Sequence, residues 1–357
     1  MENKNNSVDQ SNEKTNNFPD LLIGIGKKLL VLIVIGLAIQ FTLPQITSFQ
    51  NNLTVIRSLK TWFLGLAIIA QFCSYIGYGI TIKELVKSAH RHFSIMRGVM
   101  ISFASTSIGM VAGGMFGAGA ATFRWVKAYG GGNEGASLSA SLPPILLDVV
   151  LLGVSLIGVV NLFFTKNLAR WQAMSFIFIS ILLITLFTFF YYALKNREKS
   201  KGIAYKVISV GFKLIRKRAD QNRINREFDK LFQAWDSLLA GGWKGPFLGQ
   251  AVNVIFDMFT VYFIFLGTGK AIPFSILITG YGLPILLGKM AFIIPGGIGV
   301  IETTMIALYS SLGIPSAQAT VVVLVYRLIS FWTPLLLGYL LIPFLSGPIK
   351  NNGTEKG

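Results

Sequence analysis

Six long apolar runs limit what this chain can fold into more than any other feature. Each approaches the roughly 20 residues that a helix needs to cross the hydrocarbon core of a bilayer. Composition agrees, because 53% of the residues are hydrophobic and only 13% are charged, whereas soluble domains are about one quarter charged. The sequence therefore predicts an all-α polytopic membrane protein with spans at residues 21–43, 62–82, 143–164, 171–194, 247–267 and 319–345.

Positive charge is concentrated in one loop. The formal net charge is +17, and residues 195–244 hold thirteen Lys or Arg against five acids. The positive-inside rule places this loop in the cytoplasm, and attraction to anionic lipid headgroups is compatible with that placement. Apolar residues recur in it at helical spacing, which predicts an amphipathic helix on the membrane surface or, alternatively, one docked on a partner helix. The apolar positions are Ile224, Phe228, Leu231, Trp235 and Leu238.

Two glycine-rich segments, 96–129 and 272–309, interrupt the apolar pattern. In the first, Gly109, Gly113 and Gly117 form overlapping GxxxG steps, which are typical either of a tight helix-packing face or of a re-entrant hairpin. The second contains Pro295 and three further glycines, at 296, 297 and 299. A broken backbone at membrane depth is tolerated only where protein or a water-filled cavity surrounds it. We therefore expect six spans and two broken or re-entrant hairpins, which hydropathy alone would count as about eight spans.

A weak internal repeat appears when the sequence is shifted by 180 residues, since Gly119 then falls on Gly299 and Tyr129 on Tyr309. If each half holds three crossings and one hairpin, the halves have opposite orientations, as in the inverted repeats of transporters. The predicted organisation is a disordered cytoplasmic tail, two membrane repeats and a second cytoplasmic tail. Their ranges are 1–19, 20–165, 166–346 and 347–357.

Charged residues inside apolar sequence are the candidate functional groups, because such residues are costly in a bilayer unless they are paired. Arg327 needs an anion, for which Glu302 and a lipid phosphate are the two candidates. Glu302 has a structural interpretation as well, as an acid at a helix N-terminus. Arg124 is either part of the site or an interfacial anchor. The full set is Glu302, Arg327, Asp148, Asp257, Arg124 and Lys289, with broken backbone at Pro295, Gly296, Gly297, Gly299, Gly117 and Gly119.

Motifs of soluble enzymes are missing from the sequence. It has no nucleophile elbow, no phosphate-binding lysine loop and no HExxH, so we expect no catalytic residues. Cys73 is the only cysteine, and no cysteine–histidine cluster suggests a metal. We expect no cofactor and no nucleic-acid partner. Three functions remain open: a lipid translocator, a membrane enzyme with Glu302 as base, and a non-catalytic partner of a separate synthase or glycosyltransferase.

The second broken segment carries a family resemblance. Pro295-Gly296-Gly297-Ile298-Gly299-Val300-Ile301-Glu302, followed by Tyr326-Arg327-Leu328, Phe331-Trp332, Pro334 and Gly338, resembles the transmembrane region of lysylphosphatidylglycerol synthases, which are also described as flippase-like. In the first half, Gly117-Ala118-Gly119 with Arg124 is similar to a second family motif, although Met115 and Thr122 depart from it.

The resemblance implies transfer of a polar lipid across the cytoplasmic membrane, in the best-known members an aminoacylated phosphatidylglycerol. Full-length synthases carry a soluble aminoacyltransferase domain after the membrane part, and this chain stops at Gly357. The expectation is therefore a translocator without lysyltransferase activity. A membrane-embedded transferase of the phosphatidylglycerol lysyltransferase type is the alternative.

Overall fold

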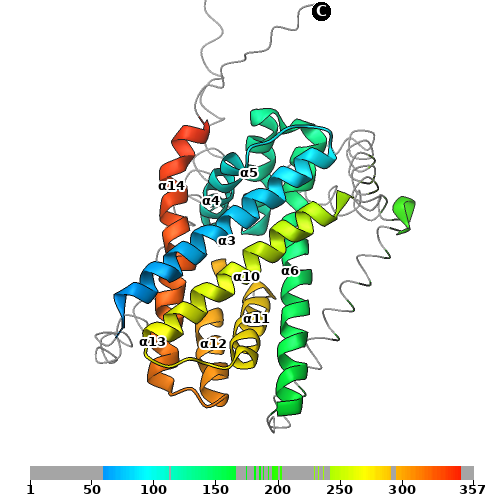
Figure 1. Ribbon diagram of the computed structural model, residues 1–357. Coiled ribbons are helices and arrows are strands. Elements are labelled where there is room, and N and C mark those ends of the chain that lie inside the picture. The colour runs from blue at the N-terminus through cyan, green and yellow to red at the C-terminus, as the bar shows by residue number, and fades with distance from the viewer. Residues whose placement is uncertain are drawn as a thin grey trace, which may run out of the picture. The chain divides into compact units, whose positions relative to one another are not determined.

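The computed structural model describes residues 59–111, 114–165, 242–290 and 295–346, together with scattered residues between 174 and 236. All of them belong to one unit, Ser48–Gly357. Every regular element in these ranges is helical, which confirms the predicted all-α class (Figure 1). The expected spans 21–43 and 171–194, the surface helix of the basic loop and both tails lie outside the described residues.

Two long helices, α3 (Thr61–Ser88) and α10 (Lys244–Gly267), lie side by side and antiparallel (Figure 1). At one end the Lys60 N–H donates to the Gly267 carbonyl at 3.0 Å. Between the ends, Gly77 and Gly249 bring the two backbones into contact, because a Cβ at either position would overlap the other helix. Small residues commonly allow such close approach between membrane helices.

A helix–break–helix pair follows each long helix. The first pair is α4 (Ile95–Val111) and α5 (Met115–Val126), and the second is α11 (Phe274–Met290) and α12 (Val300–Ser311). In both pairs the first helix has 17 residues and the second has 12. The glycines before α5 and α12 have positive φ, a conformation that costs side-chain-bearing residues free energy.

A third element completes each half. α6 (Gly132–Thr165) follows α5 through the π turn η1 (Lys127–Gly131), and it packs against α11 of the other half. Its counterpart is α13 (Ser316–Arg327), continued by the π turn η4 (Leu328–Trp332) into α14 (Thr333–Ser346). α14 packs against α4 in return. Gly158 on α6 and Gly338 on α14 stand 180 residues apart, and each allows this crosswise contact.

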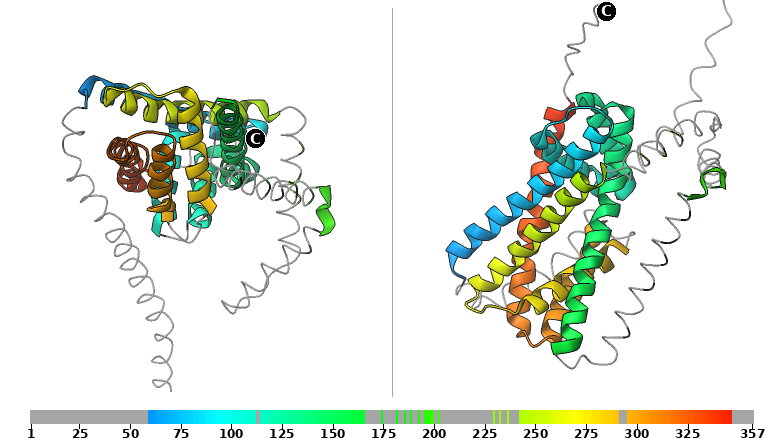
Figure 2. Two further views of the ribbon diagram at one scale, coloured as in Figure 1. Left: turned by 90° about the horizontal axis from the view of Figure 1, so that it is seen from below. Right: turned by 45° about the vertical axis from the view of Figure 1, so that its right-hand side comes forward.

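The two halves therefore repeat one order of elements in opposite directions, which is the inverted repeat expected from the sequence. Figures 1 and 2 show α4 and α5 at one end of the long helices and α11 and α12 at the other. The shift of 180 residues fails across the breaks, however. α4 and α11 begin at 95 and 274, but α5 and α12 begin at 115 and 300. Gly114, and not Gly119, is thus the counterpart of Gly299, because the second break is longer and includes the 3₁₀ turn η3 (Pro295–Gly297).

The helices have the length and surface of membrane spans. Four of those described are long and apolar enough to cross a bilayer, at Thr61–Ser88, Phe116–Gly158, Lys244–Gly267 and Ser316–Leu345, and α4 and α11 are shorter apolar helices. Large apolar side chains on their outer faces are exposed, including Phe116, Leu340 and Phe344. Such exposure is expected where lipid, and not water, is the surrounding solvent.

Candidate functional site

The break before α12 fixes the position of Glu302. Gly299, with a φ of 85°, caps the helix, and its N–H donates to Glu302 Oε2 at 2.6 Å. An acid in the first turn of a helix is favoured by the free N–H groups and by the helix dipole. This local interaction accounts for one carboxylate oxygen and leaves the other, Oε1, free to accept from a different helix.

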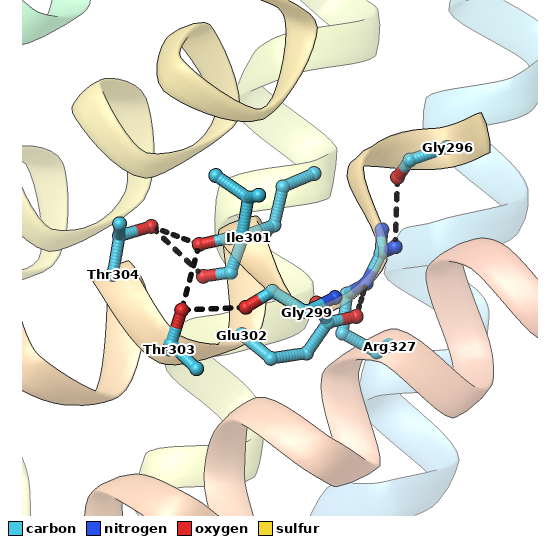
Figure 3. Close-up of polar contacts among 8 residues, drawn as sticks. Gly296, Gly299, Ile301, Glu302, Thr303, Thr304 and Arg327 are labelled. Atoms are coloured by element: carbon cyan, nitrogen blue, oxygen red, sulfur yellow. Dashed lines mark hydrogen bonds and ion pairs between the residues drawn. The ribbon is translucent and has the colours of Figure 1, made fainter. Parts of the chain in front are cut away.

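Arg327, the last residue of α13, takes that second oxygen. Its Nε donates to Glu302 Oε1 at 2.5 Å, and its Nη2 donates to the Gly296 carbonyl at 3.0 Å (Figure 3). The guanidinium carbon lies 4.3 Å from the centre of the Phe331 ring. The side chains of Arg327 and Glu302 are only 7% and 4% exposed. The break and the last repeat element are therefore joined by a buried ion pair.

Glycine is required at this junction for steric reasons. Gly296 has a φ of 64°, and a Cβ there would overlap the ring of Phe331. A Cβ on Gly297 would press on the backbone of Gly288 in α11. The sequence Pro-Gly-Gly-Ile-Gly thus permits a sharp turn that also presents the Gly296 carbonyl to Arg327.

The π turn η4 begins directly after Arg327. Its carbonyls at Ile329 and Ser330 lie 3.2 Å from the hydroxyl of Tyr75, which donates to them from α3. Single π turns inside helices occur frequently at functional sites. Here the turn lies beside the ion pair, because Phe331 within it covers the Arg327 guanidinium.

Asp257 on α10 is the centre of a second polar cluster. The hydroxyls of Tyr281 and Tyr326 both donate to its Oδ2, each at 2.6 Å. Tyr326 immediately precedes Arg327, so this cluster adjoins the ion pair along α13. The sequence singled out Asp257, but it gave no signal for Tyr281, since an isolated tyrosine in an apolar helix has many possible neighbours.

Asp148 and Lys289 form a separate ion pair between α6 and α11, with Nζ and Oδ1 2.5 Å apart. These side chains are 44% and 32% exposed, in contrast to the buried Glu302–Arg327 pair. Lys289 follows Gly288, whose backbone contacts Gly297. Chain connectivity therefore places this pair next to the break.

Three predicted site residues take other places. Arg124 is exposed on α5, and no ion pair joins it to another residue of the described ranges. Gly117 and Gly119 were expected at a break in the backbone, but they lie inside the helix α5. That expectation was wrong: the interruption falls at 112–114, and Gly119 instead faces the Ala140 carbonyl of α6, 3.3 Å from where its Cβ would be. Metal ligation finds no support in the described ranges, which contain no group of three or more His, Cys, Asp or Glu side chains that could hold an ion.

Apolar spanning helices, two antiparallel halves and ion pairs at a helix break define a polytopic α-helical membrane protein. The family model described as "Lysylphosphatidylglycerol synthase TM region" matches residues 28–338. The chain belongs to that family.

Curated relatives are proteins named only as membrane proteins. A UPF0104 membrane protein of Pyrococcus horikoshii is 42% identical over 93 residues, covering 24% of this chain and 25% of the relative. One from Methanothermobacter thermautotrophicus is 23% identical over 235 residues, covering 62% of this chain and 68% of the relative. One from Methanocaldococcus jannaschii is 27% identical over 149 residues, covering 40% and 44%. No solved structure matches.

Proposed function

We propose that this protein transfers a polar lipid across the cytoplasmic membrane, and that Arg327 binds the phosphate of the headgroup. The observation that carries the proposal is the buried ion pair at the helix break. A guanidinium has five N–H donors, and Arg327 uses two of them in its bonds to Glu302 and Gly296. Guanidinium binds phosphate through parallel hydrogen bonds, so the remaining donors suit an incoming headgroup.

The pair also fits the charge of an aminoacylated phosphatidylglycerol. Such a headgroup has one phosphate and at least one ammonium group, which are complementary to Arg327 and Glu302 respectively. Exchange of partners would leave every charge compensated, while a site with Arg327 alone would leave the ammonium unpaired. In the lipid-free state Glu302 serves as the internal anion for Arg327.

A role for Glu302 as a catalytic base is disfavoured. One of its oxygens accepts from the Gly299 N–H and the other from Arg327 Nε. A carboxylate whose oxygens are both engaged in charge-assisted or N-cap hydrogen bonds is a weak proton acceptor. Cytoplasmic placement of both termini and of the 195–244 loop, and re-entry of the two broken pairs, remain parts of the proposal.

The test is lipid transfer in reconstituted vesicles. Lysylphosphatidylglycerol supplied in the inner leaflet would be detected at the outer face by a membrane-impermeant amine reagent. We expect Arg327→Ala to lower the initial rate at least tenfold, and Arg327→Lys to retain part of it. Arg124→Ala is the matched control, because Arg124 is exposed and unpaired with other described residues. Equal rates for wild type and Arg327→Ala would remove the proposed role of Arg327.

A further inference from the structure

The Asp257 cluster contains a buried acceptor that lacks a donor. Besides the two tyrosine hydroxyls, Gln71 on α3 hydrogen-bonds the Asp257 carboxyl group. Gln71 is 3% exposed, and its Oε1 has no hydrogen-bond partner among the residues that the structure describes. A buried acceptor left without a donor costs about 1–3 kcal/mol. Something that donates a hydrogen bond is therefore missing from the cluster.

The charges around Asp257 do not balance either. The helices near it contribute Tyr75 from α3, Tyr281 and Lys289 from α11, Tyr326 and Arg327 from α13, Glu302 from α12 and Asp148 from α6. Lys289 is paired with Asp148, and Arg327 with Glu302. The tyrosines are neutral. Within the described ranges, an ionised Asp257 is thus the one acid of this group without a basic partner, and an uncompensated charge in a low-dielectric interior is costly.

One proton satisfies both requirements. Protonated at Oδ1, Asp257 gains an O–H donor while Oδ2 continues to accept from Tyr281 and Tyr326. The orientation of a glutamine amide is an assignment that follows its hydrogen bonds, so a half-turn of the Gln71 amide presents Oε1 to that O–H. The proton also removes the uncompensated negative charge. A sodium ion would need more oxygen ligands than this cluster offers among described side chains.

Asp257 and Arg327 interact electrostatically, and Tyr326 links them along α13. A phosphate bound at Arg327 adds negative charge beside Asp257 and offsets the attraction of the guanidinium. We propose that Asp257 takes up one proton when an anionic headgroup binds at Arg327. The proposal rests on the lipid function proposed above. By linkage, the proton strengthens headgroup binding by the same factor as the headgroup strengthens proton binding.

Infrared difference spectroscopy on the purified full-length protein tests this directly, because a protonated carboxylic acid has its own carbonyl band. Phosphatidylglycerol would be added at constant pH to protein in an uncharged detergent, with diacylglycerol as the matched lipid without phosphate. We expect the band to grow with phosphatidylglycerol only. It should be absent in Asp257→Asn and unchanged in Glu84→Gln, a carboxylate at the far end of α3.

A second variant guards against misfolding of Asp257→Asn. Tyr281→Phe removes one donor to Oδ2, and hydrogen bonds to an ionised acceptor are about twice as strong as those to a neutral one. Protonation becomes easier, so the midpoint of the band should move to higher pH by about one unit. No movement, or movement to lower pH, would overturn the proposal.

Other outcomes separate this inference from the proposed function. A band that persists in Asp257→Asn, that follows pH but ignores phosphatidylglycerol, or that responds to sodium in place of pH overturns the proposal. A band that grows with phosphatidylglycerol in a protein without lipid transfer supports proton uptake and refutes translocation. Direct measurement in weak buffer should count about one proton per protein for wild type and close to none for Asp257→Asn.

Discussion

Replacing Glu302 by glutamine should expose the cost of the buried ion pair. Gln keeps the shape of the side chain, and its Oε1 can still accept from the Gly299 N–H that caps α12. The variant leaves the Arg327 guanidinium, whose side chain is 7% exposed, without its anion. Loss of one partner of a buried pair typically costs about 3–5 kcal/mol. The retained cap and the bond to Gly296 place our expectation near 3 kcal/mol.

A double-mutant cycle separates this cost from other effects. The second variant is Arg327→Met, and the double variant Glu302→Gln/Arg327→Met removes both charges at once. Since the expense of each single variant is the charge left behind, the double variant should be less destabilised than the sum of the two by about 2 kcal/mol or more. Reversible unfolding in mixed detergent micelles gives the free energies.

The matched control is Arg124→Met, where the same change of side chain is made on an exposed face of α5. It should alter the free energy of unfolding by no more than about 0.5 kcal/mol. The reasoning is refuted if Glu302→Gln costs less than about 1 kcal/mol, or if the two single variants combine additively.

Three further predictions concern the break, the crosswise packing and the second ion pair. Gly296→Ala should be more destabilising than Gly313→Ala, because both residues have positive φ but only at 296 would a Cβ overlap a neighbour; equal thermal shifts would contradict the overlap. Gly338→Ala should cost about 1–3 kcal/mol by forcing α14 from α4, whereas Gly153→Ala, which has open space, should be neutral or slightly stabilising; a harmless Gly338→Ala would refute the contact. In a protein whose single cysteine is replaced, Lys289→Cys should react with a water-soluble thiol reagent and the fully buried Met305→Cys should not, since charges at membrane depth face water-filled space; equal labelling would show that the exposure is to lipid.

Local features of the sequence were sufficient for the class of protein and for the position of the second break. Apolar runs define spanning helices because the bilayer imposes a length, and Pro295 with three glycines permits one kind of backbone turn. Glu302 and Arg327 could be proposed as partners because an intramembrane charge requires one. The equal lengths of the helices on either side of each break, in contrast, were hidden by the weak similarity of the halves.

The sequence alone thus determined an all-α membrane protein with a broken helix and a small set of intramembrane charges. Tertiary structure decided which of these charges meet. Asp257 lies against Tyr281 and Gln71 only because α10 crosses α3 and α11 at particular rotations, and the residue spacing along one helix does not fix its rotation against another. Arg124 stays apart for the same reason. The unequal lengths of the two breaks changed the correspondence between the halves, and only the folded chain shows where an insertion is accommodated.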